Sequence, residues 1–496
     1  MANARGQQPR SASWGSEADA SGEADSTTAY LDESSEAYSK LVSDAVQRSP
    51  HPNVLKRVEG KSTIMEVTFN FVNTVVGAGI VGLPWVFTQA GFWMTLVELV
   101  LCCMLTHYSV KMLIDTGIRH NVRNYEDLCE HALGRRGKIT VSLSLLAFDY
   151  GALLTYLIIL GDASSAVAYR LGGWGEDTPD SPNPAWVRQA CIVGCSTTLI
   201  LPFCLYRDVS KLEKLSAVSV FTVVVIIAIV VAKFFEQGYS PDTPGMSVPP
   251  HPSLGDLPFF GPSIFKSFSI IAFAFVCHDS AFLIFNTLKK PTSLRWNIVS
   301  TLSLSASLLT CLALAVPGYL TFGAGTCTAS SDPACTGTKP NLLENYKITD
   351  DVVVFMRAVY VFVMAFTYPL SFFVTRHIVN VWIFNKDSWF GEYEMVQDMS
   401  TKRLVCLSLS IFLSSVGIAL FVRNLGDVMS LAGGLGAVVL AFILPPLCKL
   451  QLGKQSVRFW RDPDPAASFR AVAGPVALMV FGAVASCGTM YQVFDG

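Results

Sequence analysis

Long apolar runs separated by short polar segments dominate the chain from about residue 64 onward. Each run approaches or exceeds the roughly 20 residues that a helix needs to cross the hydrocarbon core of a bilayer. The pattern therefore predicts an all-α polytopic membrane protein with about eleven transmembrane helices. The expected spans are residues 64–87, 92–114, 139–168, 187–205, 216–235, 262–288, 296–322, 351–384, 403–422, 425–447 and 469–494.

The distribution of lysine and arginine sets the expected orientation. If the N-terminus is cytosolic, about 24 of these residues fall in inner loops and flanks and about six fall outside, as the positive-inside rule requires. One misplaced span would scramble this alternation. The alternation therefore supports both the count of spans and a cytosolic N-terminus, with the C-terminus on the outer side.

The first 55 or so residues differ from the rest. The stretch "GSEADASGEADSTTAYLDESSEAYSK" is rich in Ser, Ala and acidic residues and almost lacks large aliphatic side chains. Such a composition predicts a disordered acidic cytosolic tail at 1–55, ahead of a transmembrane domain at 56–496. The tail is not a signal peptide, because no basic start leads into an apolar stretch. It could be phosphorylated or simply solubilising, and its protein partners are unknown.

Composition excludes several classes of function. Only 15% of the residues are charged and 51% are hydrophobic, whereas soluble domains carry about 25% charged residues. The formal net charge of -2 gives no indication of a nucleic-acid partner. The chain contains no H-E-x-x-H, no G-x-S-x-G and no Walker lysine. We therefore expect no enzyme activity and no cofactor, and the expected surroundings are the lipid bilayer.

The first span contains "GAGIVG" at residues 77–82, which matches the dinucleotide fingerprint G-x-G-x-x-G, and Glu98 follows at roughly the right distance. A Rossmann turn needs a short strand and an amphipathic helix, but both flanks here are apolar. Gly77 and Gly79 instead lie about 20 Å into a membrane helix, and Pro84 follows. The glycines predict either an unwound segment or close helix packing.

The sixth span favours unwinding. It reads "FAFVCHDSAF", with His278 and Asp279 near the middle of the membrane segment, where a charged group is costly and usually functional. This span runs opposite to the first and follows it by five spans. Paired interrupted helices of opposite direction indicate an inverted-repeat secondary transporter. The expected repeats are residues 62–236 and 260–448, with an extra helix at 469–494.

Three motifs carry a family resemblance: "NTVVGAGIVGLPW", "FAFVCHDS…LKKPTSLRW" and "NLLENY…FTYPLSFFVTR". With them the chain resembles the sodium-coupled neutral amino acid transporters, within the amino acid/auxin permease family. The resemblance implies a LeuT-type fold, a 5+5 inverted repeat plus one C-terminal helix. It also implies secondary active transport of neutral α-amino acids, coupled to Na⁺ or H⁺. The membrane is plasma or vacuolar/lysosomal.

The resemblance also implies roles for individual residues. Asn73 occupies the position of a residue that contacts sodium and substrate, and Thr367 in "FTYP" matches a sodium-site threonine. Asn73 could otherwise make an interhelical hydrogen bond. The exposed N–H groups at the first break would hold the substrate carboxylate, and the carbonyl groups at the second break would hold its ammonium. The expected substrate site comprises Asn73, Gly77, Ala78, Gly79, Ile80, Phe275, Val276, Cys277 and His278.

Three points stay open in the sequence. Coupling to H⁺ would use His278 or Asp149, although Asp149 could equally bond to a neighbouring hydroxyl. Cys327 and Cys335 flank "TASSDPA" in a long outer loop, where a disulfide could form. An amino-acid sensor on a transporter fold, with little flux, is the alternative function.

The alternation of basic loops makes the topology testable. Epitope tags placed before Met1 and after Gly496 should become accessible from opposite sides of the membrane in protease- or antibody-protection assays. If both tags report the same side, the eleven-span topology is wrong.

Overall fold

A computed structural model describes residues 60–172, 185–207, 216–236, 257–323, 337–384, 400–455 and 465–494. The chain divides into two units, Met1–Gly60 and Lys61–Gly496, and the description below concerns the second. The expected tail at 1–55 lies outside the described residues, as do Cys327 and Cys335.

Helices make up all the regular structure of the described residues. Ser62 and Leu288 form one isolated β-bridge, and the described residues contain no strand. Within the same ranges, nine helices are long and apolar enough to cross a membrane, or ten if the bent pair Ile64–Val75 and Gly79–Ala90 is one span. The helix α10 (Ser216–Phe235) contributes the shorter apolar segment Phe221–Phe235. The all-helical polytopic fold is therefore confirmed, and the count of eleven spans stays a prediction.

Each apolar run of the sequence lies in a helix or in a series of consecutive helices. The elements of the first half are α2 (Ile64–Val75), η1 (Ala78–Gly82), α3 (Leu83–Ala90), α4 (Phe92–His120), α5 (Tyr125–Leu133), α6 (Arg135–Leu171), α7 (Ala185–Cys195), η2 (Ser196–Ile200), α8 (Leu201–Cys204) and α10. Those of the second half are α11 (Ile264–Phe275), α12 (His278–Thr287), α13 (Ser293–Phe322), η3 (Leu342–Asn345), α14 (Asp351–Phe384), α15 (Thr401–Phe421), α16 (Leu425–Ala432), η6 (Gly433–Ala437), η7 (Val439–Ile443), α17 (Leu444–Gln455) and α18 (Pro465–Phe494).

The helix α5 was not expected from the sequence. It is short and carries Glu126, Asp127 and Glu130, so it does not register as an apolar run. Its aromatic residue Tyr125 is buried, and the hydroxyl donates a hydrogen bond to the carbonyl of Leu440 at 2.6 Å. This bond ties the connection between α4 and α6 to the tenth expected span.

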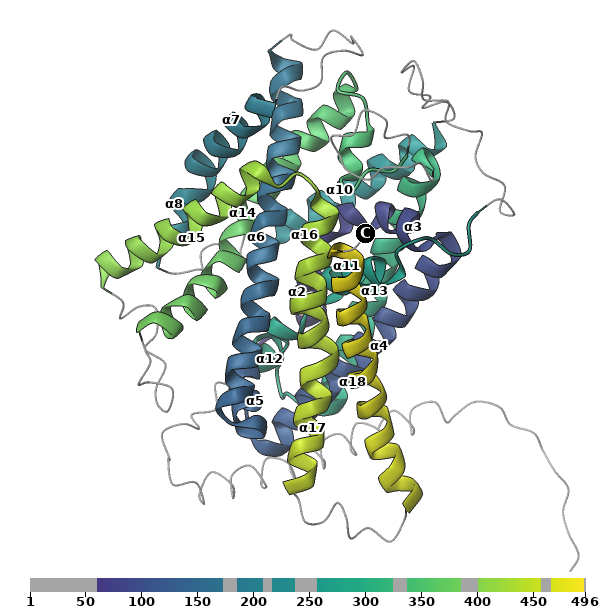
Figure 1. Cartoon of the computed structure of the whole chain (residues 1–496), viewed down its shortest axis with the longest axis vertical. Helices are drawn as coiled ribbons and strands as arrows, with labels where there is room; N and C mark the ends of the chain where they lie inside the picture. Colours follow the sequence, from purple (N-terminus) through teal and green to yellow (C-terminus); the bar gives the residue numbers. More distant parts are fainter. Residues whose placement is uncertain are drawn as a thin grey trace, which may run out of the picture. The chain divides into compact units, whose positions relative to one another are not determined.

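The helices around the two expected breaks pack on a common framework. The long helix α6 packs against α14, α16 and η6, while α11 packs against α3, α4, α16, η6 and α18. Figure 1 shows α16 and α17 as parts of one long light green helix with α18 beside it, in agreement with their contacts. The breaks are thus surrounded by helices that come from both expected repeats.

Glycines allow η6 to approach its neighbours at the level of the backbone. A Cβ atom on Gly433 would overlap the carbonyl oxygen of Ser269 in α11. One on Gly436 would lie 2.7 Å from the backbone nitrogen of Phe148 in α6. Both η6 and η7 are π-helical, a form that is common at functional sites. Close backbone contact therefore fixes α6, α11 and η6 relative to one another.

We predict that Gly433→Ala destabilises the protein by about 1–3 kcal/mol, because the new methyl group meets backbone that cannot rotate away. The matched control is Gly417→Ala in α15, where a Cβ atom meets nothing within 4 Å. Thermal unfolding in detergent should show a lower midpoint for the first variant only. Equal midpoints for the two variants would contradict the packing described for η6.

Candidate functional site

The first expected helix break is present. The α-helical hydrogen bonds of α2 end where the Val76 N–H donates to Val72 at 2.7 Å, and the Gly77 N–H then donates to Val75 at 3.0 Å. A short 3₁₀-helix, η1, follows, and the chain bends by 50° between the two halves. The first N–H groups of a helix have no intrahelical acceptor. The start of η1 therefore exposes backbone donors in the middle of the span.

Gly77 and Gly79 have different surroundings. Gly77 has φ -101 and ψ -159, an extended conformation open to any residue, and a Cβ atom there would meet nothing within 4 Å. A Cβ atom on Gly79 would lie 3.3 Å from both the Cα and the Cβ of Ala274 in α11. Gly79 thus serves close helix packing. Neither backbone strain nor packing requires a glycine at position 77, so the space beside it is available for a ligand.

The second expected break is also present. The N–H of Val276 donates to Ala272 at 2.9 Å, the last α-helical bond of α11, and Val276 is extended with φ -66 and ψ 129. The helical conformation resumes after Cys277, and α12 begins at His278. The last carbonyl groups of α11 have no intrahelical donor. Because α11 packs against η1 and α3, these acceptors and the donors of η1 belong to neighbouring segments.

Side chains at the second break are buried, and His278 is directed towards its supporting helices. Phe275, Val276, Cys277 and His278 are each at most 4% exposed. The imidazole Nε2 of His278 lies 3.2 Å from the hydroxyl of Ser109 in α4, which in turn donates to a carbonyl in η7. The side chain of His278 therefore joins α12 to α4 and η7, whereas the backbone of His278 forms part of the second break.

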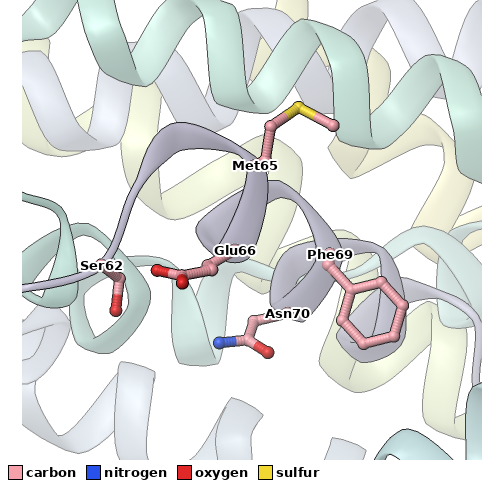
Figure 2. Close-up of a pocket in the computed structure, with 5 residues that line it drawn as sticks. All are labelled: Ser62, Met65, Glu66, Phe69 and Asn70. Carbon is pink, nitrogen blue, oxygen red and sulfur yellow. The ribbon is translucent and has the colours of Figure 1, made fainter.

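A groove follows one face of α2. It has a volume of about 470 Å³ and is lined by Ser62, Met65, Glu66, Phe69 and Asn70. Figure 2 shows the side chains of Glu66 and Asn70 on the same side of the helix.

The polar face of the groove leads to the first break. The spacing of Glu66, Asn70 and Asn73 places them along one face of α2, which ends at Val75, two residues before Gly77. The residues of the groove could have been found from these polar positions, which recur at helical spacing within an apolar run.

On the side opposite the groove, charged and aromatic contacts close the region of the two breaks. The Lys266 ammonium of α11 lies 2.6 Å from the Asp427 carboxylate of α16 and 5.3 Å from the ring centroid of Trp85 in α3. The Trp85 side chain is 2% exposed and leaves no room for a Cβ atom on Gly426. The three elements are thus held together on the expected outer side.

A second set of contacts secures the segment between α13 and α14. Asp162 of α6 accepts hydrogen bonds from Arg188 at 2.6 Å and from Asn341 at 3.2 Å. The adjacent 3₁₀-helix η3 packs against η1 and α6. Its Glu344 lies near Asp162, and burial together with that neighbouring carboxylate raises the pKa of Glu344 well above its usual value. The segment between α13 and α14 therefore covers the first break.

The two residues expected to bind sodium lie on separate helices. Thr367 in α14 is half-buried, and its hydroxyl donates to the carbonyl of Val363 at 2.8 Å, so its lone pairs remain able to accept a cation. Asn73 in α2 is also half-buried. The helices α2 and α14 are not among the pairs that pack closely in the described part of the chain.

The residue Asp149 is 2% exposed and lies in α6, and the structure brings it near Asp279, Ser371 and Tyr156. Sequence reasoning missed this grouping, because its members come from α6, α12 and α14. Glu98, the acidic residue of the fingerprint, is buried in α4 and accepts a hydrogen bond from Ser267. It therefore has no part in a nucleotide site.

Known proteins of similar sequence match most of the chain. The sequence profile of the family described as "Transmembrane amino acid transporter protein" matches residues 60–493. The chain is 31% identical over 427 residues to the "Putative sodium-coupled neutral amino acid transporter 11" of Danio rerio, covering 86% of each protein. It is 32% identical over 399 residues to the protein of that name from Rattus norvegicus, covering 80% of this chain and 79% of that one. It is 26% identical over 414 residues to "Vacuolar amino acid transporter 2" of Saccharomyces cerevisiae, covering 83% and 81%.

The contrast between the two glycines predicts opposite phenotypes. Gly77→Val should fold, because a Cβ atom at this position meets nothing within 4 Å, but it should reduce amino-acid uptake to background by filling the space beside the break. Gly79→Val should instead lower the yield of folded protein, because its side chain meets α11. The measurements are monodispersity in detergent and uptake into proteoliposomes. A well-folded Gly77→Val with normal uptake would show that no ligand occupies this space.

Proposed function

Because the chain belongs to the transmembrane amino acid transporter family, we propose that it is a cation-coupled secondary active transporter of neutral α-amino acids. The substrate binds between the breaks of α2–α3 and α11–α12. One observation supports the proposal most directly. A Cβ atom on Gly77 would meet nothing within 4 Å, although the neighbouring residues are buried among helices. Gly77 also lies next to the exposed backbone N–H groups at the start of η1. A membrane location with several spans and a transport role agree with the family, which is one of transporters and not of enzymes.

The two breaks supply the two charges that an α-amino acid needs. The N–H groups at the start of η1 complement the substrate carboxylate, and the terminal carbonyls of α11 near Phe275 to Cys277 complement its ammonium. Both interactions are strengthened by the low dielectric of the surroundings. A zwitterion satisfies both ends at once, whereas a single ion would leave one of them unsatisfied. The substrate side chain would extend towards α6 and α14 and set size selection.

Alternating access follows from the contacts on the two sides of the breaks. The pair Lys266–Asp427 and the ring of Trp85 hold the expected outer side closed, while the groove along α2 leads towards Gly77 from the other side. In the opposite state, a movement of α2 would close the groove on its face, and the contacts of Lys266 would separate. We place the N-terminus in the cytosol, and the membrane is plasma or vacuolar/lysosomal.

The coupling cation that we propose first is Na⁺, bound by Asn73 and Thr367 together with carbonyl oxygens at the first break. Amide, hydroxyl and carbonyl oxygens suit a hard cation. Since α2 and α14 do not pack closely in this conformation, a bound ion would draw the two helices together. Ion binding would thereby favour the state in which the groove is closed.

Uptake into proteoliposomes tests the proposed function as a whole. Purified protein should accumulate at least one of a panel of labelled neutral L-amino acids when an inward Na⁺ or H⁺ gradient is imposed. Binding of an amino acid without accumulation or exchange would instead establish the sensor alternative. Failure to bind any member of the panel would contradict the proposal.

Thr367→Ala should raise the Na⁺ concentration for half-maximal uptake about tenfold, because one charge-assisted contact worth about 1.5 kcal/mol is lost. Thr310→Ala in α13 is the matched control, since this half-buried threonine also donates to the carbonyl four residues earlier, at 2.8 Å. The measurement is a Na⁺ titration of initial uptake rates. Superimposable titrations for Thr367→Ala and the unmodified protein would remove Thr367 from the ion site.

A further inference from the structure

One nitrogen of a buried histidine at the second helix break has no hydrogen-bond partner. His278, the first residue of α12, is 0% exposed, and its Nδ1 atom has no partner among the described residues. The other ring nitrogen, Nε2, lies 3.2 Å from the Ser109 hydroxyl of α4. A neutral imidazole has one donor and one acceptor nitrogen, so the role of Nδ1 follows from the role of Nε2.

The hydrogen bonds of Ser109 determine which ring nitrogen carries the proton. The Ser109 hydroxyl donates to the carbonyl oxygen of Ala441 in η7. A carbonyl oxygen can only accept, so the single hydroxyl hydrogen of Ser109 lies between these two oxygens. The Ser109 oxygen must then accept from Nε2 of His278, which is the donor nitrogen of the ring. The Nδ1 atom of a neutral ring therefore carries a lone pair.

The surroundings of His278 favour the neutral ring. A buried charge is costly unless a group of opposite charge pairs with it. The ion pairs of the described residues do not include His278. The carboxylate of the adjacent Asp279 accepts instead from the Ser280 hydroxyl at 3.4 Å. A buried acceptor without a donor is also costly, so a donor that is absent from the protein itself is expected to satisfy Nδ1.

The Nδ1 atom lies among the backbone acceptors of the break. It is the ring nitrogen nearer to the backbone, and the backbone of His278 follows the break directly. The last carbonyl groups of α11, up to those of Phe275 and Val276, have no intrahelical donor. The next carbonyl, that of Cys277, already accepts from the Ser280 hydroxyl at 3.3 Å. Carbonyl oxygens and one imidazole nitrogen thus form a set of acceptors.

We propose that Nδ1 of His278 accepts a hydrogen bond from the ammonium group of the bound amino acid. The proposal rests on the proposed transport function and adds a side chain that recognises the substrate. An ammonium carries only donors, so backbone carbonyls and Nδ1 can satisfy it together. A carboxylate has no donor for Nδ1, and its oxygens would repel the lone pair. The ring therefore fixes which end of the zwitterion faces the second break.

The contact between His278 and Ser109 prepares the ring for this role. Because Nε2 is held by Ser109, the direction of Nδ1 is set before the substrate arrives, which lowers the entropy lost on binding. A hydrogen bond from an ionised donor is about twice as strong as one between neutral groups. A metal ion does not suit the position, because no group of three or more His, Cys, Asp or Glu side chains among the described residues could hold one.

Two substitutions separate the two nitrogens of the ring. In His278→Gln the side-chain amide can replace Nε2 and bond to Ser109, but nothing replaces Nδ1. In His278→Asn the shorter amide can replace Nδ1, but it does not reach Ser109. His107→Gln is the matched control, because this half-buried histidine of α4 has its ring 3.3 Å from a serine hydroxyl, that of Ser300 in α13.

The variants are compared by thermal unfolding in detergent and by uptake of a labelled neutral L-amino acid that the unmodified protein accumulates. We expect His278→Gln to keep its unfolding midpoint and to need about tenfold more amino acid for half-maximal uptake, because one charge-assisted bond is lost. His278→Asn should unfold at a lower temperature but lose less affinity than His278→Gln. His107→Gln should need the same concentration as the unmodified protein.

Two results of this comparison would overturn the proposal. The first is an unchanged half-saturating concentration in His278→Gln. The second is a loss of affinity in His278→Asn that equals or exceeds the loss in His278→Gln, because the ring would then act only through Ser109.

A spectroscopic measurement tests the same contact in the unmodified protein. His278 follows Cys277 in the only Cys-His pair of the chain, so its signals can be assigned by labelling histidine with ¹⁵N and the cysteine carbonyl with ¹³C. We expect a ring that is protonated at Nε2, and an Nδ1 resonance that shifts when the same amino acid is added to saturation. A protonated Nδ1, or a resonance that saturation leaves unchanged, would contradict the proposal. Absence of amino-acid binding by the unmodified protein would contradict the transport function itself.

Discussion

The need to satisfy backbone hydrogen-bonding groups inside a bilayer constrains every part of this protein. A continuous helix satisfies them internally, but α2–α3 and α11–α12 are both interrupted in mid-span. The donors at the start of η1 and the acceptors at the end of α11 are tolerated only because surrounding helices exclude lipid. In the proposed function, those unsatisfied groups bind the two charges of a zwitterion without charged side chains.

The surrounding structure maintains the breaks at fixed positions. Close backbone contact at Gly433 and Gly79 leaves α11 little freedom relative to η6 and η1. The hydrogen bond of His278 to Ser109 anchors the start of α12 to α4. Polar side chains around the breaks thus serve mostly to position backbone. The exceptions include the buried Oδ2 of Asp149, which has no hydrogen-bond partner among the described residues.

Much of this arrangement could be predicted from local sequence. Runs of apolar residues long enough to span a bilayer identify the helices, and glycines or an adjacent His-Asp pair inside such a run identify the breaks. The different surroundings of Gly77 and Gly79 could not be predicted, because Ala274, which contacts only the second, is distant in sequence. The direction of the His278 ring and the approach of Asp149 to Asp279 depend on the same long-range packing. The helix α5 was not predicted, because its charged residues interrupt the apolar pattern of its buried face.

The central claim is that an amino acid binds between the two breaks. The most direct test is a cryo-electron microscopy structure determined with a saturating concentration of the amino acid that gives the highest uptake. The account predicts ligand density beside Gly77, with its carboxylate on the N–H groups of η1 and its ammonium on the carbonyls of residues 275–277. Density at another site, with both breaks unoccupied, would contradict it.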